Sequence, residues 1–286
     1  MISRRAFLIA SAIPVLHGQN QKQKMFSNAE AYNRFMGRWS SLMAAPLLDF
    51  AAIPSTGRIL DVGTGTGALA IEIVKRKPAV HVTGIDPSEE FFAYARTRSP
   101  FPDRTTFQPG DAQDLKFPGA TFSASLSLLV FNFIPDPAKA LRELRRVTRS
   151  GAGITAAVWD YGDRMRMLRA FWDAAVSVDP AAEKQDEKHM PLCRAGQLSQ
   201  LWKQGGLKNI QEKPLEIAAR FSTFADYWDP FLLGQGPAGA YVRNLLADKL
   251  PALRNAVKRQ LSLSSESQPF TLPARVWAVR GTVPAK

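Results

Sequence analysis

Cysteine and histidine are scarce in this chain of 286 residues. Cys193 is its single cysteine, so no disulfide can form within the chain and no site with several cysteine ligands can be built. The three histidines, His17, His81 and His189, lack the close spacing of metal ligands. The sequence therefore predicts no metal site.

Long apolar runs are also missing. The run at residues 6–16 is too short to cross a bilayer, although it has the length of the apolar region of a signal peptide. It follows Arg4 and Arg5, and SRRAFL at 3–8 resembles the twin-arginine signal for the export of folded proteins. No Ala-x-Ala cleavage site ends the run. Residues 1–24 are thus either such a signal or an N-terminal extension, and no membrane span is predicted.

Negative charge is in deficit, because 37 lysines and arginines outnumber 25 acidic residues and give a formal net charge of +12. Such a charge suits an anionic partner, for example nucleic acid, a membrane surface or an acidic substrate. The basic residues are dispersed, however. Their densest group, in ALRELRRVTR at 140–149, has helical spacing beside leucines, which is typical of a solvated helix face.

Short apolar runs alternate with amphipathic segments over residues 27–159, which predicts parallel strands separated by helices. The expected strands are 58–61, 80–86, 105–108, 122–130 and 153–159. The expected helices are 27–50, one from the glycine turn to about 77, 89–98, and 136–148. In such a sheet, ligands bind at the carboxyl ends of the strands.

The pattern changes after Trp159. Residues 164–193 predict one or two helices, and 210–221 and 270–280 predict two strands. Each of these strands contains a proline, which favours an edge or bulged position. The glycine-rich loop at 234–239 is either a moving lid or a plain surface turn.

A glycine turn follows the first expected strand, in ILDVGTGTGALA at 59–70. Gly63, Gly65 and Gly67 allow positive φ angles and leave room for a ligand against bare backbone. Asp61 precedes them by two residues. The spacing is GxGxG and not the GxGxxG of dinucleotide-binding folds, so a different cofactor is expected.

The turn resembles the first motif of class I S-adenosylmethionine (SAM)-dependent methyltransferases. Segments 32–39, 158–161 and 225–231 extend the resemblance to a bacterial small-molecule branch, methyltransferase type 11. The resemblance implies an α/β fold: a doubly wound, mostly parallel, seven-stranded Rossmann-like sheet with a helical cap inserted after the fifth strand. The core with its N-terminal helix would occupy 25–160, and the cap with a closing strand hairpin would occupy 161–286.

The resemblance also implies the residues that bind SAM. The methionine portion would contact Asp61, Gly63, Thr64, Gly65 and Gly67. The ribose hydroxyls would bind Asp86, whose carboxylate can accept from both. Adenine would pack near Pro87 and Ser88 and meet Asp111, Ala112 and Gln113, while the backbone of Ser127 and Leu128 would hold the ammonium group. Each has a structural alternative, since an aspartate that ends a strand is often a helix N-cap.

Several side chains are candidates for the substrate side of the site. Tyr32, Trp39, Trp159 and Tyr161 are suited either to face the sulfonium through cation–π attraction or to pack in the core. Asn132 either orients the acceptor or caps the loop before Pro135. Quinone-type carbon methyltransferases often have histidines here, and this chain has Phe131-Asn132-Phe133 instead. No catalytic residue is assigned.

The predicted function is methyl transfer from SAM to a small molecule by in-line displacement. One alternative is an RNA or DNA methyltransferase, although the chain lacks both the Asn/Asp-Pro-Pro-Tyr/Phe motif and a Pro-Cys pair. A SAM-binding module without catalysis is the other. Because SAM is made in the cytoplasm, a cytoplasmic location is expected. The acceptor atom and the oligomeric state cannot be read from the sequence.

Overall fold

The computed structural model describes residues 28–285, and the predicted signal or extension at 1–24 lies outside them. Seven strands form one sheet in the order β3-β2-β1-β4-β5-β7-β6. The strands are β1 (Thr56–Val62), β2 (Ala79–Asp86), β3 (Thr105–Pro109), β4 (Phe122–Leu128), β5 (Thr148–Trp159), β6 (Lys208–Phe221) and β7 (Phe270–Thr282). β1 to β5 are parallel and β7 is antiparallel to both of its neighbours. The predicted doubly wound, mostly parallel sheet is confirmed.

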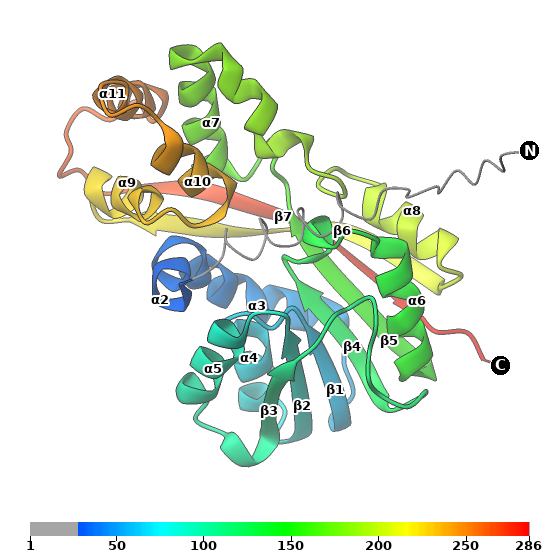
Figure 1. Ribbon diagram of the computed structural model, residues 1–286. Helices are drawn as coiled ribbons and strands as arrows, with labels where there is room; N and C mark the ends of the chain where they lie inside the picture. The colour runs from blue at the N-terminus through cyan, green and yellow to red at the C-terminus, as the bar shows by residue number, and fades with distance from the viewer. Residues whose placement is uncertain (1–27, 286) are drawn as a thin grey trace, which may run out of the picture.

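Helices fill both faces of this sheet, with α3, α4 and α5 on one side and α6 and α8 on the other (Figure 1). The α-helices are α2 (Ala29–Tyr32), α3 (Arg38–Ala51), α4 (Ala68–Arg76), α5 (Glu89–Arg98), α6 (Pro137–Val147), α7 (Arg166–Val178), α8 (Gln197–Gln204), α9 (Phe224–Leu232), α10 (Gly236–Asn244) and α11 (Leu250–Gln260). The shorter helical turns are η1 (Asn33–Gly37), η2 (Pro102–Arg104), η3 (Phe131–Phe133), η4 (Pro180–Gln185) and η5 (Glu187–His189). No helix within residues 28–285 is both long and apolar enough to cross a membrane.

The two proline-containing strands occupy different positions. β6 is the edge strand and carries Pro214, as expected for a residue without an amide hydrogen. β7 is interior, between β5 and β6, but Pro273 pairs only with Ala218 of β6. The pairing of β5 with β7 begins at Val276, so Pro273 lies beyond it and no ladder hydrogen bond is lost there.

The cap predicted after β5 consists of α7, α9, α10 and α11, which gather over one end of β6 and β7 (Figure 1). Its interior is aromatic: the rings of Phe171 and Phe231 stack with centroids 4.5 Å apart. The buried Tyr227 hydroxyl donates to the Met167 carbonyl oxygen at 2.7 Å. The glycine-rich segment at 234–239 includes the first turn of α10, and most of it is buried.

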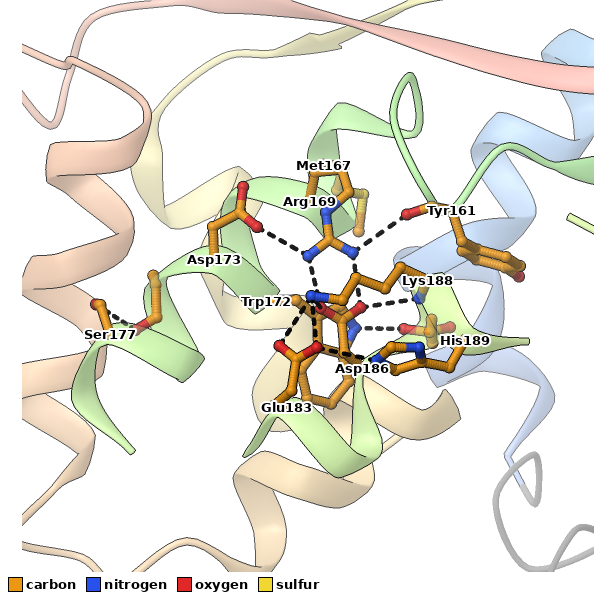
Figure 2. A network of polar contacts seen from close by, with 12 residues as sticks. Tyr161, Met167, Arg169, Trp172, Asp173, Ser177, Glu183, Asp186, Lys188 and His189 are labelled. Atoms are coloured by element: carbon orange, nitrogen blue, oxygen red, sulfur yellow. Dashed lines mark hydrogen bonds and ion pairs between the residues drawn. The ribbon is translucent and has the colours of Figure 1, made fainter. Parts of the chain in front are cut away.

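A buried ion pair connects α7 to the turns that follow it (Figure 2). Arg169 donates to both carboxylate oxygens of Asp186, at 2.6 and 2.7 Å, and to the Tyr161 carbonyl oxygen at 3.2 Å. Burial alone would raise the pKa of Asp186, but hydrogen bonds from Arg169 and from the Lys188 amide outweigh it and hold the pKa below its usual value. Arg169 also pairs with the half-exposed Asp173. The network therefore fixes the chain where it leaves β5.

Replacing Arg169 by methionine should lower the free energy of unfolding by about 3–5 kcal/mol, because it leaves the buried Asp186 carboxylate without its partner. Asp173→Asn is the control. It removes a contact to a carboxylate whose side chain is 42% exposed, and should cost less than about 1 kcal/mol. Urea unfolding at pH 7 measures both, and equal losses would contradict this account of the network.

Candidate functional site

A cleft of about 750 Å³ opens at the carboxyl ends of the parallel strands. Its walls come from the N-terminal helices, the turn after β1, the ends of β2, β3 and β4, and the loop after β4. The residues that line it are Tyr32, Ser40, Asp61, Val62, Gly63, Thr64, Gly65, Thr66, Ala68, Leu69, Asp86, Pro87, Ser88, Phe91, Pro109, Gly110, Asp111, Ala112, Gln113, Asp114, Lys116, Leu128, Leu129, Val130, Phe133, Ile134 and Pro135. The volume lies within the range of small-molecule sites.

The glycine turn is fixed by hydrogen bonds to the neighbouring strand. The amides of Gly63 and Thr64 both donate to the Ile85 carbonyl oxygen, at 2.8 and 2.9 Å. Gly63 has a φ of +69°, and a Cβ there would lie 2.4 Å from a methyl carbon of Val130. At Gly65, with a φ of +52°, a Cβ would meet only the Gly63 carbonyl oxygen, at 4.0 Å. The backbone at Gly65 therefore borders open space.

Asp86 ends β2 with its carboxylate held from two directions. One oxygen accepts from the Gly65 amide and the other from the Ser88 amide, both at 2.9 Å. Burial raises the pKa of Asp86 to about 6, although these two hydrogen bonds act to lower it. Asp86 is only 8% exposed and lines the cleft, so its remaining lone pairs can accept hydrogen bonds from a ligand there.

Asp61 ends β1 in a more isolated position. Its Oδ2 accepts from the Thr64 hydroxyl at 2.8 Å, while its buried Oδ1 has no hydrogen-bond partner among residues 28–285. Burial raises the pKa of Asp61 to about 7, against the lowering effect of the Thr64 hydrogen bond and of the nearby Ala70 amide. A buried carboxylate oxygen without a partner is costly, which is typical of a site that binds a donor or a cation.

The turn after β3 forms the third polar wall. Asp111 Oδ1 accepts from the Gln113 amide at 2.8 Å, and the Asp114 amide donates to the Asp111 carbonyl oxygen at 3.0 Å. Gln113 Oε1 accepts from the Asp136 amide at 2.9 Å, which ties this turn to the start of α6. The turn is thus rigid, and Ala112 presents its small side chain to the cleft.

Comparison with known proteins identifies this arrangement. Residues 60–155 match the family described as "Methyltransferase domain". The 2-methyl-6-phytyl-1,4-hydroquinone methyltransferase 2 of Oryza sativa subsp. japonica is 36% identical over 138 residues, which cover 48% of this chain and 39% of that protein. The demethylmenaquinone methyltransferase of Roseiflexus sp. (strain RS-1) is 32% identical over 155 residues, covering 48% of this chain and 62% of the relative. The chain contains a class I SAM-dependent methyltransferase domain.

A solved structure agrees on the fold. Phosphoethanolamine N-methyltransferase 2 of Haemonchus contortus, in complex with SAM, superposes with a TM-score of 0.58 at 16% identity, over 96% of this chain and 61% of that one. At that identity the likeness concerns the fold alone. The chain spans less than two thirds of the length of the two curated relatives named above.

Most residues predicted to bind the cofactor do line the cleft of the methyltransferase domain. They are Asp61, Gly63, Thr64, Gly65, Asp86, Pro87, Ser88, Asp111, Ala112, Gln113 and Leu128, together with the substrate-side candidate Tyr32. Their roles toward SAM stay predictions.

Two predicted cofactor residues lie outside the cleft wall. Gly67 is the N-cap of α4 with a φ of +85°, and a Cβ there would lie 3.1 Å from Cβ of Ala95 in α5. The close approach of α4 to α5 therefore explains why this position is a glycine. The Ser127 hydroxyl donates to the Val62 carbonyl oxygen at 2.9 Å, so this side chain connects β4 to β1 within the sheet.

Four candidates for the substrate side of the site also do not line the cleft. Trp39 is 3% exposed and packs edge-on against Phe221, and Trp159 and Tyr161 are 1% and 3% exposed. The packing alternative therefore fits all three. Asn132 donates through Nδ2 to the Met190 sulfur at 3.3 Å, and its buried Oδ1 has no partner among residues 28–285.

Sequence reasoning missed Phe91, Phe133 and Lys116, which line the cleft. A signal for Phe91 was present: it follows the predicted Ser88 by three residues at the start of α5, and residues three apart share a helix face. No comparable periodicity marks Phe133 or Lys116. The predicted cap contributes none of the lining residues found within 28–285.

Stability should depend on pH through Asp61. Because its folded-state pKa is about 7 and its ordinary value is 3.8, the folded protein binds more protons than the unfolded chain between these values. Stability from this group is therefore lost as pH rises from about 4 to 7. Asp61→Asn should raise the free energy of unfolding at pH 8 by on the order of 3 kcal/mol, and by much less at pH 4.5.

Urea titrations of wild type and Asp61→Asn at the two pH values measure this difference in the absence of SAM. Asp103→Asn is the control, because Asp103 is exposed in η2. A wild-type advantage over Asp61→Asn at pH 8 would show that Asp61 is not a strained carboxylate.

Proposed function

We propose that this protein binds SAM in the cleft and transfers the methyl group to a small-molecule acceptor. The unpartnered Asp61 Oδ1 is the observation that carries the proposal. It lies at the end of β1, beside the glycine turn whose open side faces the cleft, where it fits the ammonium group of the cofactor's methionine portion.

The other cleft residues fit the same cofactor. Asp86 Oδ1 and Oδ2 each have a fixed backbone donor, so the carboxylate is oriented to accept from the two ribose hydroxyls. The rigid turn at Asp111 and Ala112 lies beyond it, where the adenine ring would pack. The order along the cleft would therefore be methionine, ribose and base, following β1, β2 and β3.

When bound, SAM supplies a methyl group on a sulfonium that is already activated for transfer. The protein's contribution is to align the acceptor with that carbon and to exclude water. Tyr32, Phe91, Phe133 and Ile134 give the cleft an aromatic and apolar wall suited to both tasks. No general base is assigned.

The acceptor class follows from that wall and from the relatives. Lys116 is the one lysine or arginine that lines the cleft within residues 28–285, which does not suit a polyanionic backbone. The two curated relatives act, by their names, on 2-methyl-6-phytyl-1,4-hydroquinone and on demethylmenaquinone. We therefore favour a partly apolar ring compound over nucleic acid as the acceptor.

Replacing Asp86 by alanine should weaken SAM binding at least about tenfold, since it removes the acceptor for the ribose hydroxyls and the hydrogen bonds that hold Gly65 and Ser88. Asp103→Ala is the matched control and should bind normally. Isothermal titration calorimetry with SAM measures both.

Transfer itself is tested with methyl-labelled SAM and a metabolite extract. Wild type should label a small organic product, and Asp86→Ala should lose at least 90% of that label. Wild-type protein that does not bind SAM would overturn the proposal. SAM binding without any labelled product would instead favour the non-catalytic module.

A further inference from the structure

The helix that enters the fold is interrupted by a π-helical turn, η1 (Asn33–Gly37), directly after Tyr32. The Arg38 amide donates to the Asn33 carbonyl oxygen, five residues back instead of four. The glycine at the end of the turn leaves room for the Asn33 side chain, because a Cβ on Gly37 would lie 2.5 Å from Asn33 Oδ1. Such turns are less stable than an α-helix and occur often at functional sites.

One guanidinium ties this turn to the cleft. Arg98, the last residue of α5, donates from Nη1 to Asn33 Oδ1 at 3.1 Å and to the Thr66 carbonyl oxygen at 3.4 Å. Thr66 belongs to the glycine turn and lines the cleft. Arg98 therefore joins the N-terminal helices, α5 and the glycine turn at one point.

A second set of contacts supports the same attachment. The Ala29 amide at the start of α2 donates to Glu90 Oε1 of α5 at 2.8 Å. The rings of Tyr32 and Phe91 lie 5.1 Å apart, and both residues line the cleft. Tyr32 and Asp86, the proposed ribose ligand, line the same cleft. Burial raises the pKa of the Tyr32 hydroxyl, a hydrogen bond with Ser40 lowers it, and the Asp86 charge raises it further.

We propose that Asn33 and Arg98 are positioning residues that latch α2 and η1 over the cleft, hold Tyr32 against the bound cofactor and set the rate at which SAM leaves. The inference rests on the proposed function, since it takes SAM to occupy the cleft. Asn33 and Arg98 touch neither the sulfonium nor the acceptor.

The contact between Asn33 and Arg98, which we call the latch, is suited to break and re-form. Arg98 is exposed, and both of its acceptors are neutral oxygens, so breaking these bonds leaves no buried charge. Once they break, η1 is free to relax toward regular α-helix. A change from hydrogen bonds that span five residues to bonds that span four would rotate Tyr32 about the helix axis, away from Phe91.

The test measures how fast tritiated SAM is lost from the full chain when unlabelled S-adenosylhomocysteine is added in excess. Arg98→Met and Asn33→Ala should each speed dissociation about tenfold, because each removes the same hydrogen bond. The double variant should be no faster than Arg98→Met, as expected when Asn33 acts through its contact with Arg98. Arg34→Met, an exposed residue of the same turn outside the latch, should leave the rate unchanged.

Gly37→Ala separates the latch from general stability. Gly37 has a φ of −61°, which alanine adopts freely, so the substitution should keep or raise the melting temperature. The added methyl displaces the Asn33 side chain from Arg98, so SAM should leave about tenfold faster from this variant as well. A purely structural role would instead lower stability and cofactor retention together.

The outcomes are distinguishable. If wild type fails to bind SAM, both the proposed function and the latch are overturned. If wild type binds SAM but Arg98→Met, Asn33→Ala and Gly37→Ala all release it at the wild-type rate, the latch alone is overturned. Faster release in these three, with Arg34→Met unchanged, supports it.

Discussion

The cleft depends on a single carbonyl oxygen, that of Ile85, which accepts hydrogen bonds from both Gly63 and Thr64. Because Val62 and Ile85 are also paired in the parallel register of β1 and β2, the glycine turn cannot shift relative to the end of β2. Asp86, the next residue, is thereby brought to the Gly65 amide. The geometry that orients both carboxylates of the site thus starts from ordinary strand pairing.

Two buried acids remain under strain within this rigid frame. Burial raises the pKa of Asp61 to about 7 and that of Asp86 to about 6. Within residues 28–285 neither is paired with a cation, in contrast to Asp186, which pairs with Arg169 of α7. The same type of side chain is therefore neutralised beside α7 and left without a cation in the cleft, where a cationic ligand would offset the cost of burying it.

The sequence predicted the fold best where apolar side chains recur at the regular spacing of a strand or a helix. The order of strands and helices followed from periodicity, and the family resemblance pointed to Asp61, Asp86 and Asp111, which line the cleft. The direction of a side chain was harder to predict, because Trp39 and Trp159 were candidates for the substrate side yet are buried in the core. The π turn was expected as part of a continuous helix at 27–50, since one extra residue in a turn leaves no mark on hydrophobic spacing.

The residues proposed to bind the methyl donor were easier to predict from the sequence than those proposed to face the acceptor. The donor side is built from strand ends whose positions the sheet dictates, so its residues were predictable. The aromatic wall proposed to align the acceptor is less regular, because Tyr32, Phe91 and Phe133 come from an interrupted helix, α5 and η3. Tyr32 reaches the cleft only because η1 and α5 hold it there. Changes in that contact are therefore expected to alter cofactor residence and acceptor access together, while the donor-binding carboxylates stay in place.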